Sequence, residues 1–154
     1  MNKDQLRKLI REVLKYLEPE IPYSETAVEL LMLTAAKESN LGEYIEQIKG
    51  PALGIFQMEP TTELCIWDNF LRHKPALKTK IKDLMDSTEA TWDLKTNLAY
   101  QVAMARVHYF RKPFPLHKQI CVDWMAKVWK KHYNTVLGAG TEEQAVKAYN
   151  KLCK

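Results

Sequence analysis

Hydrophobic residues recur every three or four positions along most of the chain, with polar and charged residues between them. This period gathers the hydrophobic side chains on one face of an α-helix, so the pattern predicts a mainly α fold with about seven helices. The expected helices begin near residues 2, 24, 61, 77, 93, 120 and 141. A short extended run, Leu53 to Met58, predicts one very small β element.

Residues with short polar side chains precede several of these segments and are expected to cap them. The expected caps are Ser24, Thr61 or Thr62, Asp93, and Thr141 with Gln144 as a capping box. Large aromatic residues at helical spacing indicate core positions. Trp67 and Trp92 are therefore expected in the core, with stacking on a sugar ring as the alternative.

The second expected helix carries a carboxylate close to its end. Glu38 follows Leu31, Thr34 and Ala35 by seven, four and three residues, which places it beside the hydrophobic stripe. Asn40 and Gly42 then supply the stop. Burial disfavours the charged form of a carboxyl group, so we expect a raised pKa for Glu38. A carboxylic acid that keeps its proton near neutral pH can protonate a leaving group.

A short segment with several turn-forming residues follows this helix, from Gly50-Pro51 to Pro60. It contains Gly54 and one amide side chain, that of Gln57. A carboxylic acid at a helix end and an amide on the next segment together predict a cleft.

These two segments resemble motifs of the soluble lytic transglycosylase and goose-type lysozyme family. Glu38-Ser39 matches its first motif, and Gly54-Ile55-Phe56-Gln57-Met58-Glu59-Pro60 matches its pattern Gly-Leu-Met-Gln-x-x-Pro, with Ile55 and Phe56 in place of Leu-Met. The resemblance implies an α+β lysozyme-like fold in which the small β element lies beside the active-site cleft. It also implies cleavage of the β-1,4 bond between MurNAc and GlcNAc in peptidoglycan glycan strands.

The resemblance implies Glu38 as the catalytic acid and Gln57, Tyr133, Ser39, Asn97 and Gly54 as substrate-site residues. In this scheme Gln57 hydrogen-bonds the sugar, and Tyr133 positions the Glu38 carboxyl group. Ser39 and Asn97 support the Glu38 carboxyl group from behind. Asn97 corresponds to the asparagine that begins the helix of the third motif.

The fourth motif of the family, Ala-Tyr-Asn-x-Gly, has two candidate positions. Tyr133-Asn134 is followed by Gly138 and Gly140, whereas Ala148-Tyr149-Asn150 matches more residues but has no glycine after it. We favour Tyr133 over Tyr149, because the turn expected after the tyrosine can form there.

The number of carboxylates separates two mechanisms. Lytic transglycosylases use a single Glu as acid and then base, and the muramic C6 hydroxyl closes a 1,6-anhydro ring. Hydrolytic goose-type lysozymes use further acidic residues, and Glu43, Glu46 and Glu59 are candidates by their proximity in sequence. We expect the transglycosylase, with a hydrolytic lysozyme or a chitin- or chitosan-cleaving enzyme as alternatives.

Composition adds few constraints. The chain has 154 residues and 46% hydrophobic content, which predicts a single domain over residues 1–154. Its net charge of +4 favours an anionic partner only weakly. The basic face from Lys127 to His132 raises a second class, a non-catalytic wall-binding or nucleic-acid-associated virion protein. Nucleic-acid-binding motifs are lacking, so we expect no nucleic-acid partner. We also expect a monomer.

Three widely spaced cysteines, Cys65, Cys121 and Cys153, fit neither a disulfide framework nor a zinc site. We expect no metal and no cofactor. The first residues lack the hydrophobic core of a signal peptide, and no run has membrane-spanning length. With the small size, these features resemble bacteriophage wall-degrading proteins, which are made in the host cytoplasm. Such a protein reaches the wall after holin-dependent release or as part of the virion.

Overall fold

The computed structural model describes residues 1–135 and 137–154, and this part of the chain contains eight α-helices. A 3₁₀ turn η1 (Leu71–His73) follows α3, and a π-helical turn η2 (Trp129–Asn134) extends α7. The helices are α1 (Lys3–Tyr16), α2 (Glu25–Ser39), α3 (Pro60–Asn69), α4 (Pro75–Leu84), α5 (Ala90–Thr96), α6 (Leu98–Phe110), α7 (Val122–Val128) and α8 (Glu142–Leu152). The predicted mainly α fold with minimal β structure is confirmed.

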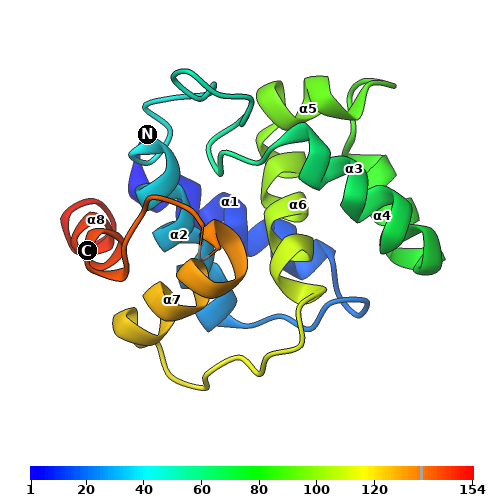
Figure 1. The fold of residues 1–154 in the computed structure, drawn as a ribbon. Coiled ribbons are helices and arrows are strands. Elements are labelled where there is room, and N and C mark those ends of the chain that lie inside the picture. The colour runs from blue at the N-terminus through cyan, green and yellow to red at the C-terminus, as the bar shows by residue number, and fades with distance from the viewer. Residues whose placement is uncertain (136) are drawn as a thin grey trace.

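Helix α2 lies at the centre of one half of the molecule and contacts α1, α6, α7 and α8 (Figure 1). Most of its side chains are buried on all sides, which explains why it is far less amphipathic than α1. The predicted cap is confirmed, because the Ser24 hydroxyl accepts a hydrogen bond from the backbone N–H of Ala27 at 3.3 Å.

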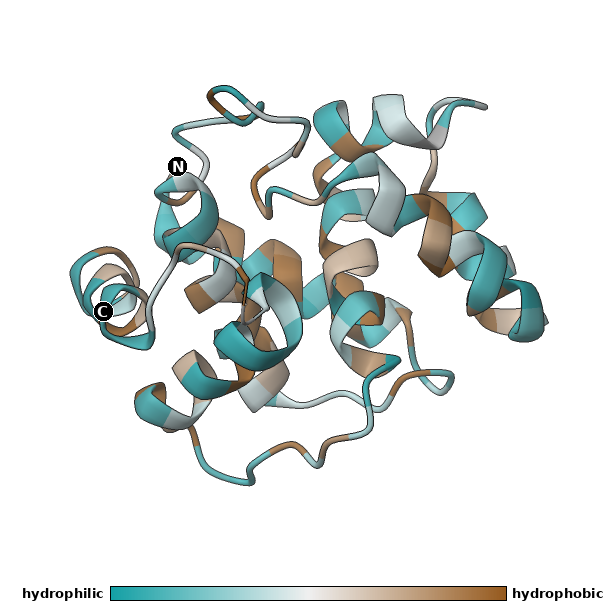
Figure 2. Cartoon of the chain, viewed as in Figure 1, coloured by the Kyte–Doolittle hydropathy of each residue, from teal (hydrophilic) through white to brown (hydrophobic). Residues whose placement is uncertain are grey.

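Helix α6 is the second central element, and every residue from Tyr100 to Tyr109 is buried. It stands between α1 and the α3–α5 group (Figure 1). Figure 2 shows hydrophobic residues on the inner parts of the helices and largely hydrophilic ones on the outer face of α4. The core is therefore built around two helices that have no polar face.

The region from 93 to 109 forms two helices where we predicted one. Asn97 has an extended backbone and caps α6, because its side-chain oxygen accepts from the Tyr100 N–H at 3.0 Å. The prediction that Asp93 is this cap is wrong. Asp93 lies inside α5, fully buried, and accepts from the N–H groups of Asp86 and Ser87 at 2.8 and 3.0 Å.

Two other helix starts test the capping expectations. Helix α3 begins at Pro60 with Glu59 as its cap residue, so neither Thr61 nor Thr62 is the cap. Proline is favoured in the first turn because its missing N–H would have no partner there. At α8 the predicted capping box of Thr141 and Gln144 is present.

The predicted β element is reduced to two isolated antiparallel bridges, from Leu53 to Glu46 and from Leu53 to Met58. They lie in the long segment that joins α2 to α3, at the top of Figure 1. None of the described helices has both the length and the hydrophobic character needed to cross a membrane.

Candidate functional site

The last turn of α2 presents Glu38 and fixes the chain that follows it. Asn40, Leu41 and Gly42 all have positive φ angles, of 54°, 60° and 81°, and they turn the chain sharply out of the helix. The buried Ser39 hydroxyl accepts from the Gly42 N–H at 2.8 Å and donates to the Ile55 carbonyl at 2.6 Å. Ser39 therefore joins the helix end to the loop that carries Gln57.

The loop from Leu53 to Met58 is held against α5 and α6. Gly54 has a φ of +75°, and a Cβ atom there would lie 2.4 Å from the Leu94 carbonyl oxygen. The next residue, Ile55, donates its N–H to the side-chain oxygen of Gln101 at 2.8 Å. Only glycine fits this close approach, and the contact sets the path of the chain into Gln57.

Gln57 is a non-glycine residue in the left-handed region, with a φ of +47°. Its amide Nε2 donates to the Gly54 carbonyl at 2.8 Å, and its side chain lines the cleft. Backbone strain of this kind costs about 1–3 kcal/mol and is found most often at binding and catalytic sites.

The opposite side of the site is the π-helical turn η2. Trp129 and Tyr133 are four residues apart in this turn and lie on the same side of it. The buried Trp129 indole donates from Nε1 to Glu38 Oε1 at 2.8 Å. The Tyr133 hydroxyl donates to the Phe56 carbonyl at 2.8 Å. The hydrogen bond to Glu38 thus comes from Trp129, whereas the hydroxyl of Tyr133, which we expected to position Glu38, bonds Phe56.

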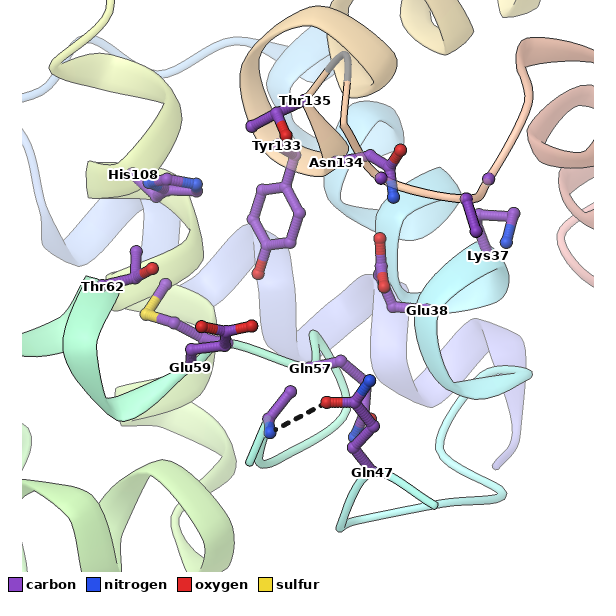
Figure 3. Close-up of a pocket in the computed structure, with 15 residues that line it drawn as sticks. Lys37, Glu38, Gln47, Gln57, Glu59, Thr62, His108, Tyr133, Asn134 and Thr135 are labelled. Atoms are coloured by element: carbon purple, nitrogen blue, oxygen red, sulfur yellow. Dashed lines mark hydrogen bonds between the residues drawn. The ribbon is translucent and has the colours of Figure 1, made fainter. Parts of the chain in front are cut away.

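These elements enclose a cleft of about 590 Å³. Figure 3 shows Glu38 and Tyr133 extending into it from two sides, with Gln57 and Gln47 at one end and Glu59 across from Glu38. Its walls come from the end of α2, the 47–62 segment, α6, η2 and the residues just before α8. The described lining residues are Lys37, Glu38, Gln47, Ala52, Gln57, Met58, Glu59, Thr62, His108, Tyr133, Asn134, Thr135, Gly138, Ala139 and Gly140.

Burial governs the protonation of Glu38. Desolvation raises the pKa of its carboxyl group, and the Trp129 hydrogen bond and the positive charge of Lys37 oppose this shift only partly. Lys37 lies over the Trp129 ring, with its Nζ 5.3 Å from the ring centre. The expected raised pKa of Glu38 is confirmed in direction, and the group is suited to donate a proton near neutral pH.

His108 lines the cleft in its neutral form. Burial, and then the positive charges of Arg111, Lys112 and His132, lower the pKa of His108 to about 3. Its Nδ1 lies 3.1 Å from the Arg111 guanidinium, which can only donate, so the His108 proton is on Nε2. Its ring packs edge-on against Tyr133 at 4.8 Å between centres. His108 supports Tyr133, and in its neutral form it is not an acid that could replace Glu38.

Only one of the three candidate second carboxylates lines the cleft. Glu43 accepts from the Asn40 amide at 2.6 Å, and Glu46 pairs with Lys95 at 2.6 Å. Both are exposed and outside the lining. Glu59 lines the cleft and is exposed.

The other predicted site residues have structural contacts. Asn97 caps α6 and donates its amide to the Leu84 carbonyl at 2.7 Å, and it is outside the cleft lining. Ser39 and Gly54 are also outside the lining and act by shaping the chain. Tyr149 is also outside the cleft lining, and its hydroxyl donates to the buried Glu29 at 2.5 Å. Of the two candidate tyrosines, Tyr133 is the one at the cleft.

Sequence reasoning missed Trp129 as a site residue. It lies on the hydrophobic face of its segment, and this position predicts a core side chain. Trp129 is indeed buried. The direction of its indole N–H, however, cannot be predicted from periodicity. Among the described residues, no group of three His, Cys, Asp or Glu side chains is arranged to hold a metal ion.

Comparisons with protein-family models, with curated proteins and with solved structures give no match for this chain.

Proposed function

We propose that this protein cleaves the glycan strands of peptidoglycan, at the β-1,4 bond between MurNAc and GlcNAc, as a lytic transglycosylase. One observation carries the proposal: Glu38 is a half-buried carboxyl group with a raised pKa, held by an indole N–H at the wall of a cleft. The resemblance of residues 38–39 and 54–60 to the lytic transglycosylase motifs supports the choice of substrate.

Glu38 would act first as an acid and then as a base. It protonates the glycosidic oxygen, and the bond to the muramic C1 breaks with positive charge on that sugar. The Glu38 carboxylate then accepts the proton of the muramic C6 hydroxyl, whose oxygen closes on C1. The products are a 1,6-anhydromuramic end and a free GlcNAc hydroxyl, and Glu38 is again protonated. The Gln57 amide and the Tyr133 ring, which both line the cleft, would hold the sugars.

Hydrolysis is the second candidate, because Glu59 lines the same cleft across from Glu38 (Figure 3). A carboxylate there could activate a water molecule against C1 in place of the C6 hydroxyl. Mass spectrometry of the released muropeptides separates the two reactions, since an anhydro end lacks one water. If the unmodified protein released muropeptides with reducing ends and the Glu59→Gln variant did not, the reaction would be hydrolysis with Glu59 as the base.

Replacement of Glu38 by Gln tests the acid directly. The amide keeps the size and the Trp129 hydrogen bond but cannot donate a proton to the leaving oxygen, so we expect the clearing of a peptidoglycan suspension to slow by about 10²-fold or more. The matched control is Glu43→Gln, an exposed carboxylate outside the cleft, which should clear at the normal rate. Normal clearing by the Glu38 variant would exclude Glu38 as the acid. Sedimentation with peptidoglycan without any clearing, even by the unmodified protein, would indicate a wall-binding module.

We also propose that the protein reaches the wall in a bacteriophage cycle, either through membrane openings at lysis or from the virion. Peptide mass spectrometry of purified phage particles distinguishes the two routes. Detection of peptides of this protein in intact particles would assign the virion route.

A further inference from the structure

A second pocket of about 290 Å³ lies on a different part of the molecule from the cleft. Its walls are the start of α2, the end of α6 and the link that follows α6, which is the long yellow segment in Figure 1. We call it the Arg106 pocket. The described lining residues are Pro22, Tyr23, Ser24, Arg106, Tyr109, Phe110, Lys112, Pro113, Phe114 and Leu116, and none of them lines the cleft.

Arg106 is the unusual member of this set. Only 4% of its surface is exposed, and its Nε is buried with no hydrogen-bond partner among the described residues. Its guanidinium lies over the Phe110 ring at 5.7 Å, and it makes no hydrogen bond or ion pair with the described residues. Burial alone lowers the pKa of Arg106 to about 10, with no carboxylate acting against it. An arginine stays charged under these conditions, so a buried positive charge lacks its counter-charge.

The lining of the pocket adds positive charge and no negative charge. Lys112 lines the same pocket, and the lining set contains no Asp or Glu. Glu25 directly follows the lining residue Ser24, and its carboxylate is paired with Arg11 at 3.1 Å and with the Tyr23 hydroxyl. The remaining walls are aromatic rings, prolines and a leucine. The pocket therefore combines an unpaired guanidinium with a hydrophobic enclosure.

We propose that the Arg106 pocket binds a carboxylate carried on a small hydrophobic body, about the size of a phenylalanine side chain. A guanidinium pairs with a carboxylate through two parallel hydrogen bonds, which would satisfy the unpaired N–H groups of Arg106. The hydrophobic body would lie against Phe110, Phe114 and Leu116, and Lys112 would add a second favourable charge. The volume is at the lower end of the range for ligand pockets, which limits the body to one ring or a short chain.

This ligand chemistry has two sources, a free organic acid and the C-terminal residue of a peptide. Isothermal titration of the full chain with 3-phenylpropanoate tests the first. A short peptide ending in phenylalanine, titrated as the free acid and as the C-terminal amide, tests the second. Acetate supplies the charge without the body, and 3-phenylpropanamide supplies the body without the charge. Saturable binding with one site is expected for the acids that carry a ring, and no binding is expected for acetate or for either amide.

Two variants assign the binding to this pocket. Arg106→Met keeps the length and the contact with Phe110 and removes the charge, and we expect the affinity to fall by about tenfold or more. Lys112→Met should weaken binding by about two- to threefold. The matched control is Lys118→Met, an exposed lysine in the same link and outside the lining, with unchanged affinity expected.

The free Arg106→Met protein supplies an independent measurement. Removing an unpaired buried charge should leave the melting temperature unchanged or raise it, whereas an arginine needed only for folding would lower it. In the unmodified protein, 3-phenylpropanoate should raise the melting temperature, and this rise should vanish in Arg106→Met. The absence of binding by any ring-bearing acid, or equal affinity in Arg106→Met, would overturn the proposal.

Discussion

Two opposing effects act on a single residue, Glu38. Burial raises the pKa of its carboxyl group, whereas the hydrogen bond from Trp129 and the charge of Lys37 favour the ionised form. A general acid needs this balance, because it must hold its proton in the free site and release it during bond cleavage. The position of Trp129 thus matters for chemistry as well as for packing.

Trp129→Phe separates the two contributions. Phenylalanine fills most of the space but removes the N–H donor, so the pKa of Glu38 should rise further and the alkaline limb of the pH–activity profile should move to higher pH. The lost orientation of the carboxyl group should lower the rate by roughly 10- to 100-fold. The control is Trp124→Phe, since Trp124 packs near Phe114 and His117 and is outside the cleft lining. An unchanged alkaline limb in Trp129→Phe would show that the indole does not act on Glu38.

The raised pKa of Glu38 also has a consequence for stability. In the unfolded chain the group titrates near its usual value of 4.5, and in the folded protein it titrates at higher pH. The folded state therefore binds more protons between these two values, and the free energy of unfolding falls as pH rises through this window. Glu38→Gln removes this loss. Its melting temperature should match that of the unmodified protein at pH 4 and exceed it at pH 8.

At pH 8 a lower melting temperature for Glu38→Gln would contradict the burial of an ionisable group at this position. Scanning calorimetry at both pH values measures the difference.

At the residue scale, the sequence was sufficient for groups whose position follows from helical spacing. Glu38 could be predicted because its intervals from Leu31, Thr34 and Ala35 place it on a defined side of α2. Trp129 satisfies the same kind of pattern, but the pattern says only that it is buried. Which polar atom a buried indole meets depends on a helix 91 positions earlier in the chain, and no local rule supplies that contact.

The element that most limits variation is the loop from Leu53 to Met58. Gly54→Ala would place a Cβ atom 2.4 Å from a backbone oxygen, at a φ of +75°. We expect the free energy of unfolding to fall by about 2 kcal/mol or more. Urea unfolding at 25 °C measures the change.

Gly50→Ala is the matched control for this loop. Gly50 is exposed, and the three atoms nearest to a Cβ atom added there belong to the end of the flexible Gln47 side chain. We expect a change within about 0.5 kcal/mol. A loss of the same size at both glycines would show that the contact with Leu94 does not set the path of the loop.

The division between α5 and α6 shows where helix prediction from sequence stops. Asp93 and Asn97 are both good cap residues, four positions apart, and the hydrophobic pattern continues through both. The choice depends on tertiary contacts: the Asp93 carboxylate accepts from the backbone of the preceding segment, and Asn97 donates to the Leu84 carbonyl. Local propensity predicted that the region is helical but could not decide which of the two residues is the cap.

The whole molecule places the site between two groups of helices that meet at α6. The Tyr133 hydroxyl spans this division and binds the carbonyl of Phe56, so η2 and the 53–58 loop hold one another. The fold class followed from periodicity alone, because helical spacing dominates the chain. Glu38 and Gln57 on neighbouring segments predicted a cleft, and the motif resemblance added Tyr133. The wall from α6, with His108, could not be predicted, because it comes from a segment far away in sequence.

The two chain ends are joined through one buried carboxylate. Glu29 of α2 accepts from Arg7 of α1 at 2.7 Å and from Tyr149 of α8 at 2.5 Å. Arg7 also donates to the Cys153 carbonyl at 2.7 Å. Tyr149 is therefore a stability residue, although its sequence context shares more residues with the Ala-Tyr-Asn-x-Gly motif than that of Tyr133.

Tyr149→Phe tests this assignment at the scale of the whole fold. The variant loses one hydrogen bond to a buried carboxylate, so the free energy of unfolding should fall by about 1–3 kcal/mol while the rate of peptidoglycan clearing by the folded protein stays unchanged. Tyr44→Phe, at a tyrosine that is 39% exposed, is the control and should change stability by less than about 0.5 kcal/mol. Tyr133→Phe should show the opposite balance, with slower clearing, because its hydroxyl fixes the cleft wall. If Tyr149→Phe slowed clearing without lowering the free energy of unfolding, Tyr149 and not Tyr133 would be the tyrosine of the fourth motif. The hydrogen bonds that link the two chain ends would then contribute to catalysis.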